Sequence, residues 1–114
     1  MEKLYRREDL SFWVCEKTLE MLKKPKEGLI EGVIGNAVPD SIEIADKSGW
    51  VDGAICDVGI VFLEKRPYIT TLMAKHTPII DTRHLATIKA LTEIAVLAYN
   101  YFYEMSISTP FGRR

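Results

Sequence analysis

Hydrophobic residues recur every three or four positions between residues 12 and 22, which is the spacing of one face of an α-helix. Ser11 stands just before this stretch and is a suitable N-cap, and Pro25 follows it and cannot continue a helix. We therefore expect a helix from about Ser11 to Lys24, with Trp13 as a packing residue. The apolar segment 29–34 contains Gly32 and lies between Gly28 and Gly35, so it should form at most one or two helical turns.

The middle of the chain changes to the patterns of β-strands. Residues 42–45 alternate between apolar and polar, 58–63 are a short apolar run, and 68–74 are rich in β-branched and aromatic residues. Short polar connections separate these three segments, so they should pair as an antiparallel meander. The first connection contains Asp52 and Gly53, and we place Cys56 and Asp57 in the same loop.

The last third of the chain predicts one long helix, over residues 85–102. Its apolar residues cover most of the helix circumference, so it needs burial on more than one side. Asp81 or Thr82 can cap its start. The expected fold is α+β: an N-terminal helix, a three-stranded antiparallel meander and a long C-terminal helix. Residues 1–114 form a single domain, structured from about residue 10 to 104, with 105–114 as a tail.

Composition narrows the range of functions. The 114 residues carry 15 Lys plus Arg against 16 Asp plus Glu, a net charge of −1, which does not suit a nucleic-acid partner. Cys15, Cys56, His76 and His84 have no metal-site spacing, so we expect no metal and no cofactor. The N-terminus has no signal-peptide pattern, and no apolar run approaches a membrane span. As written, the chain is expected to be cytoplasmic and not membrane-bound.

The strongest candidate for chemistry is the tetrapeptide Lys47-Ser48-Gly49-Trp50, near the end of the first expected strand. With Ala45-Asp46 ahead of it, it resembles the Lys-Thr/Ser-Gly box of class A serine β-lactamases and penicillin-binding proteins. The helix and the Ala37-Val38-Pro39 loop before the box, and the hairpin around Arg66-Pro67-Tyr68 after it, also match that family. The similarity extends from about Leu10 to Glu104. It implies the C-terminal part of the β-lactamase/transpeptidase-like fold.

The resemblance gives each residue of the box an expected role. Penicillins and D-alanyl-D-alanine peptides both carry a carboxylate beside the bond that is attacked. Lys47 would supply positive charge, and the Ser48 hydroxyl would donate a hydrogen bond to that carboxylate. Gly49 would let the strand backbone approach the substrate. The backbone N–H of Trp50 would be one of two oxyanion-hole donors. The parent family is usually secreted or periplasmic.

Three parts of the family pattern are missing. The nucleophile of the family lies in a Ser-x-x-Lys motif, but the residues three positions after the five serines are Val14, Ile44, Val51, Thr109 and Phe111. Ser-Asp-Asn is also absent. In addition, some class A enzymes hold the carboxylate with an Arg on the following strand, where residues 58–61 offer none. We expect no catalytic residue in this chain and no turnover by the chain alone.

The resemblance implies that the parent enzyme hydrolyses β-lactams through an acyl-enzyme. The second candidate for the parent enzyme is a D-alanyl-D-alanine carboxypeptidase or another penicillin-recognising serine hydrolase. Two alternatives stay open for the chain itself. It is either a non-catalytic remnant that self-associates, or one chain of a split enzyme completed by an N-terminal chain. The expected partners are therefore a second copy, because residues 68–74 form an open strand edge, or that missing chain. A β-lactam or D-alanyl-D-alanine-like ligand is expected only in the completed protein.

Overall fold

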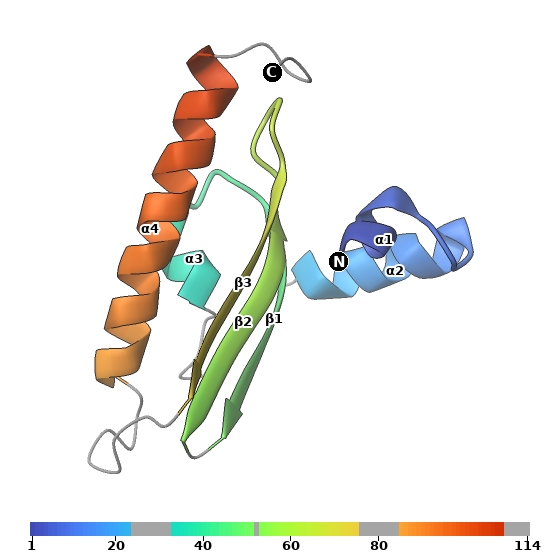
Figure 1. The fold of residues 1–114 in the computed structure, drawn as a ribbon. Helices are drawn as coiled ribbons and strands as arrows, with labels where there is room; N and C mark the ends of the chain where they lie inside the picture. Colours follow the sequence, from blue (N-terminus) through green and yellow to red (C-terminus); the bar gives the residue numbers. More distant parts are fainter. Residues whose placement is uncertain (24–32, 52, 76–84, 109–114) are drawn as a thin grey trace.

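The computed structural model describes residues 1–23, 33–51, 53–75 and 85–108. Four helices and three strands lie in these ranges (Figure 1): α1 (Glu2–Arg6), α2 (Phe12–Lys23), α3 (Val33–Ala37), β1 (Ile44–Val51), β2 (Ala54–Val61), β3 (Tyr68–Lys75) and α4 (Leu85–Ser108). The strands form one antiparallel sheet in the order β1-β2-β3. The expected α+β fold, with its N-terminal helix, meander and long C-terminal helix, is confirmed.

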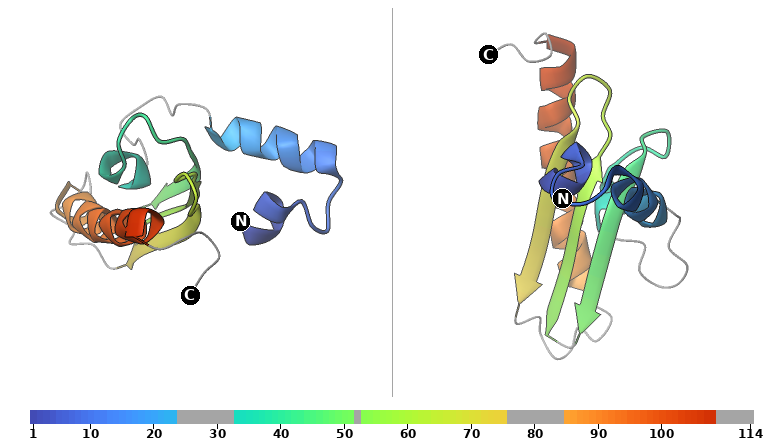
Figure 2. Two further views of the ribbon diagram at one scale, coloured as in Figure 1. Left: turned by 90° about the horizontal axis from the view of Figure 1, so that it is seen from above. Right: turned by 90° about the vertical axis from the view of Figure 1, so that its right-hand side faces the viewer.

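The two faces of the sheet are covered very differently. On one face, which we call the α4 face, Ile55, Val61 and Leu72 pack against α3 and α4 and form the main core. On the opposite face, the α2 face, Ala45 and Ile60 form a smaller cluster with Leu19 of α2. Two views of the ribbon show α3 and α4 lying along the α4 face, whereas α2 points away from the sheet (Figures 1 and 2). Much of the α2 face therefore has none of the four described helices over it.

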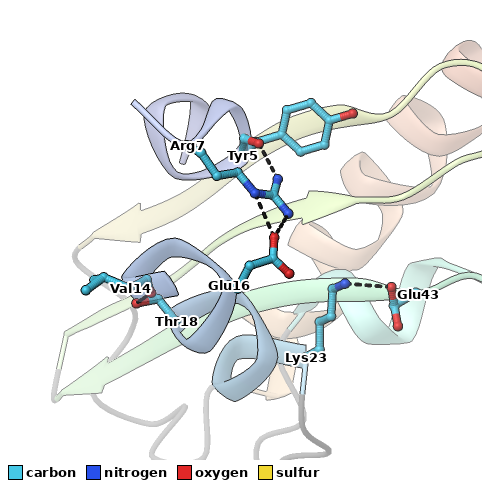
Figure 3. Close-up of polar contacts among 7 residues, drawn as sticks. All are labelled: Tyr5, Arg7, Val14, Glu16, Thr18, Lys23 and Glu43. Atoms are coloured by element: carbon cyan, nitrogen blue, oxygen red, sulfur yellow. Dashed lines mark hydrogen bonds and ion pairs between the residues drawn. The ribbon is translucent and has the colours of Figure 1, made fainter. Parts of the chain in front are cut away.

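A few polar contacts hold the N-terminal helices in place (Figure 3). The Ser11 hydroxyl accepts a hydrogen bond from the Val14 N–H at 3.2 Å, as expected of an N-cap. The Arg7 guanidinium pairs with Glu16 and so links the segment after α1 to α2. At the other end of α2, the Lys23 ammonium lies 2.9 Å from the Glu43 carboxylate, just before β1. Both ion pairs are partly exposed to solvent, so they orient α2 more than they stabilise it.

Three details of the expected fold were wrong. Cys56 and Asp57 lie inside β2 and not in a loop; a carboxylate before an apolar run suggests a turn, but here it is buried inside the strand. Trp13, expected to pack, is 67% exposed, because α2 points away from the sheet. The third detail concerns the far end of the chain. The last helix continues to Ser108, beyond the expected boundary at residue 104, and the Ser106 hydroxyl donates to the Tyr103 carbonyl in its final turns.

Other differences concern the start of the chain and the ends of elements. The short helix α1 precedes residue 10, where no regular structure was expected. Strand β1 begins at Ile44 and runs on to Val51, so Lys47 lies in its middle and not near its end. The proposed caps Asp81 and Thr82, and the tail from residue 109 onward, lie outside the described residues. Within the described ranges, every helix is too short or too polar to cross a bilayer.

Candidate substrate-binding strand

The four candidate residues Lys47-Ser48-Gly49-Trp50 lie on β1, at the edge of the sheet. The Phe62 N–H donates to the Glu43 carbonyl at 2.9 Å, which makes these two residues a hydrogen-bonded pair at the start of the β1–β2 ladder. In an antiparallel ladder, hydrogen-bonded and non-hydrogen-bonded pairs alternate. The backbone groups of Lys47 and Gly49 therefore point toward β2. Those of Ser48 and Trp50 point away from β2, toward the outer edge.

The side chains of the four residues divide between the two faces. Strand alternation places Lys47 and Gly49 on the α2 face, with Ala45, and Ser48 and Trp50 on the α4 face. Lys47 is exposed, whereas the other three are half-buried. The Lys47 ammonium donates to the Ser48 carbonyl at 2.6 Å, so it lies beside the outward-pointing backbone of the strand. All four residues lie on the edge strand, so the Lys47 ammonium and the outward-pointing backbone N–H groups of Ser48 and Trp50 are found at the same edge.

Gly49 leaves space at this edge for a small apolar cavity. A Cβ atom on Gly49 would lie only 3.0 Å from the Cys56 sulfur on the neighbouring strand. Gly49, Cys56 and Met73 form one row across the three strands on the α2 face. This row and the next one, which ends in Lys75, line a mainly apolar cavity of about 380 Å³. Sequence reasoning missed Cys56 and Met73 here, although the strand register would have placed both beside Gly49.

Two buried carboxylates support the strand from the α4 face. Asp46 and Asp57 are 4% and 0% exposed, and Asp57 lies directly opposite Ser48 in the ladder. An oxygen of Asp57 accepts the backbone N–H of Ile34 at 2.9 Å, which joins β2 to α3, the helix that leads into β1. Asp57 had been interpreted as a turn residue; it is a buried link behind the candidate site.

The described residues contain no group of three or more His, Cys, Asp or Glu side chains placed to hold a metal ion. His76 and His84 lie outside those residues. Cys15 and Cys56 are both free thiols, one buried in α2 and the other half-buried in β2. The site therefore consists of one cation, one hydroxyl and the backbone of an edge strand. Such a set can hold and polarise a carboxylate or a carbonyl.

Comparison with known proteins shows which family the whole chain resembles. The model of the beta-lactamase enzyme family matches residues 1–102. Among solved structures, PBP-A is similar with a TM-score of 0.68 and 20% identity over 89% of this chain. A variant of PBP-A, solved as an acyl-enzyme complex with penicillin G, gives the same values. A beta-lactamase from Sphaerobacter thermophilus has a TM-score of 0.62 and 21% identity over 88% of this chain.

The similarity covers only part of these larger proteins. The chain spans 37% of the PBP-A chain and 37% of the Sphaerobacter thermophilus chain. No curated protein sequence matches the chain. At this level of identity, the structural likeness concerns the fold.

Proposed function

The chain belongs to the beta-lactamase enzyme family, and we propose that it is the substrate-binding-strand portion of a serine hydrolase that acts on β-lactams. The observation that carries this proposal is the position of Lys47-Ser48-Gly49-Trp50 on the outer edge of β1. A substrate that lies along this edge meets backbone donors and a lysine at once.

The chemistry of each residue fits a substrate with a carboxylate beside an acyl group. The Lys47 ammonium supplies the positive charge, and the Ser48 hydroxyl supplies a hydrogen bond to the carboxylate; hydrogen bonds that involve ionised groups are the stronger ones. The Trp50 N–H, directed away from β2, is suited to a developing oxyanion. Gly49 keeps the α2 face clear of a side chain next to Cys56.

The chain is proposed to be inactive by itself. Acyl transfer needs a nucleophile activated by a base, and none of the five serines is followed by a lysine three positions later. PBP-A with penicillin G has been solved as an acyl-enzyme, which supports acyl transfer from penicillin on this fold. The chain would contribute binding and one oxyanion donor, and the nucleophile would come from outside these 114 residues.

A second substrate class has one observation in its favour. Strand β2 carries no arginine along its whole length, Ala54–Val61, although some class A enzymes use an arginine there to hold the penicillin carboxylate. A D-alanyl-D-alanine peptide is therefore the alternative substrate of the completed enzyme, which would then be a carboxypeptidase.

The inactivity is tested with the purified chain and a chromogenic cephalosporin. We expect no hydrolysis above the buffer rate, and no change in the intact mass of 13.0 kDa after incubation with penicillin G. Lys47→Ala and Lys89→Ala, a lysine on the exposed side of α4, serve as the matched pair. Hydrolysis that follows the protein through every fraction and is lost only in Lys47→Ala would show that the chain is an enzyme.

A further inference from the structure

Three polar side chains lie together on the α4 face, beside the main core. Asp46 and Ser48 alternate onto this face of β1, and Asp57 lies on the same face of β2, directly opposite Ser48. Both carboxyl groups are buried, that of Asp57 completely. A buried acidic group therefore lies behind the residue whose hydroxyl is proposed to bind the substrate.

The pairing of the two strands brings the side chains of Ser48 and Asp57 close together. Hydrogen-bonded pairs in this ladder begin at Glu43 and Phe62 and recur at every second position. Ser48 and Asp57 consequently form a non-hydrogen-bonded pair, the kind in which facing side chains approach each other most closely. A displacement of Asp57 is thus passed on to Ser48 directly.

Asp57 is held from outside the sheet, by the short helix α3. Its carboxyl group accepts the N–H of Ile34 at 2.9 Å, and α3 contacts both β1 and β2. The side chain of Ile34 also lies over Gly59 of the same strand. Burying a carboxyl group costs free energy, and apolar groups of similar shape are often at least as stable in such places. Stability therefore gives no reason for an acid at this position, whereas a fixed distance between α3 and the sheet does.

We propose that Asp57 is a positioning residue for substrate binding. By accepting the Ile34 N–H, it fixes β2 against α3 and so fixes the place of Ser48 on the edge strand. Asp57 itself does not touch the substrate, because its carboxyl group is completely buried and directed toward α3. The inference rests on the proposed function, which gives Ser48 its role. It assigns to Asp57 a part in ligand affinity and not only in folding.

Three substitutions at Asp57 separate its hydrogen bond from its other contacts. Asp57→Asn keeps an oxygen that can accept the Ile34 N–H, whereas Asp57→Ala removes the acceptor. Asp57→Val also lacks the acceptor but keeps the volume, and it replaces the alanine variant if that variant does not fold. Asp40→Asn is the matched control, because Asp40 is exposed in the segment between α3 and β1. Circular dichroism checks the folding of each variant.

The first measurement is hydrogen exchange of backbone amides, which needs no ligand. The N–H groups of Lys47 and Gly49 point toward β2 and report on the pairing of the edge strand, and that of Thr70 reports on the pairing of β2 with β3. Without the acceptor, we expect exchange of the two edge-strand amides to rise about tenfold more than that of Thr70. Asp57→Asn and Asp40→Asn should show no such difference. Equal acceleration at all three amides, or none, would overturn the proposal, because Asp57 would then serve only general stability.

The second measurement is a titration of the same proteins with penicillin G, followed through the amide signals of Ser48 and Trp50. We expect the apparent Kd to rise about fivefold or more in Asp57→Ala, and to stay within about twofold in Asp57→Asn and Asp40→Asn. An unchanged affinity in the folded alanine or valine variant would overturn the proposal. An equal loss of affinity in Asp57→Asn would also overturn it, since the acceptor oxygen is retained there.

The two measurements keep this inference apart from the proposed function. If the unchanged protein does not bind penicillin G but the exchange pattern is as expected, the proposed substrate is wrong, and the effect of Asp57 on the edge strand is supported. If penicillin G binds and the exchange pattern is absent, the proposed function stands and the positioning role of Asp57 is wrong.

Discussion

Gly59, in the middle of β2, is the glycine of the described ranges at which an added Cβ atom would meet the closest contacts. A Cβ atom there would lie 2.8 Å from the Asp46 Cβ, 2.9 Å from the Ala45 carbonyl oxygen and 3.0 Å from the Ile34 Cδ1. Two of these atoms belong to β1 and cannot move without shifting the strand that carries the candidate site. The absence of a side chain at Gly59 thus keeps β1 in place.

Gly59→Ala is therefore expected to lower the free energy of unfolding by about 1–3 kcal/mol, the usual cost of overpacking. Gly35→Ala is the control, because its added Cβ would meet only the Ile44 Cδ1, at 3.6 Å, an ordinary contact. In helix α3 this change should be neutral or stabilising by up to about 1 kcal/mol. Urea unfolding of both variants decides the matter, and equal stabilities would contradict the tight packing at Gly59.

The sequence was sufficient to find the tetrapeptide of the candidate site, but not the buried carboxylate of Asp57 that lies behind it. Lys47-Ser48-Gly49-Trp50 is a contiguous motif, so a resemblance could find it without a structure. Asp57 could not be interpreted in the same way, because its partner, the Ile34 N–H, is 23 positions away in the sequence. A buried carboxylate in a strand is recognised only when the group that it binds is known.

At the scale of elements, the contact between β3 and α4 depends on aromatic stacking. The rings of Tyr68 and Phe102 are stacked with their centroids 4.3 Å apart. Burial raises the pKa of Tyr68 from 10.0 to about 12, and the nearby Tyr99 adds to the rise. The neutral phenol is thus the form that the folded protein favours. The contribution of the buried neutral phenol to the free energy of unfolding is complete below the unfolded pKa near 10, and it is lost as the pH rises toward 12.

Tyr68→Phe should remove this alkaline loss of stability, because phenylalanine keeps the ring and has no proton to release. The free energy of unfolding, measured from about pH 9 to about pH 12, should fall less steeply in the variant than in the unchanged chain. Tyr101→Phe, at a tyrosine that is 60% exposed, should retain the steep fall. If all three proteins lose stability in parallel, Tyr68 is not the group responsible.

The order of the helices and strands could be predicted from the spacing of hydrophobic residues. Where each element ends, and what it packs against, could not. The change from period two to helical spacing gave the meander and the last helix. The five-residue helix α1 is too short to produce a period. Trp13 was misjudged because a helical stripe shows which side is apolar, not whether another element covers it. On α2 that stripe is buried at Cys15 and Leu19 and half-buried at Leu22, whereas Phe12 is exposed.

At the scale of the whole molecule, the chain is more open than its length requires. Its radius of gyration is 15.1 Å, whereas a compact domain of this size has about 13 Å. The excess agrees with α2 pointing away from the sheet and with the uncovered α2 face (Figure 2). Ile94 and Leu97 on α4 are also more than half exposed. Such apolar areas normally lie against another chain.

We therefore expect that the isolated chain is not a stable monomer. In the isolated chain, the outer edge of β3 and the exposed side of α4 are available for self-association. Light scattering at micromolar concentration should give a mass above 13.0 kDa, and Leu97→Asp should lower it. A mass of 13.0 kDa, together with unfolding that does not depend on protein concentration, would contradict this expectation.

The central claim is that the edge of β1 carries the groups that recognise a penicillin. The sequence alone predicts such a ligand only for the completed protein. The backbone of Ser48 and Trp50, which points outward beside the Lys47 ammonium, leads us to propose that the chain itself also binds penicillin, weakly and without reacting with it. The most direct measurement is a titration of the ¹⁵N-labelled chain with penicillin G, followed through the backbone amide signals. We predict saturable shifts centred on Ser48 and Trp50, retained in Lys89→Ala and at least severalfold weaker in Lys47→Ala. Shifts spread evenly over the chain, or shifts at β1 that Lys47→Ala leaves unchanged, would contradict the account.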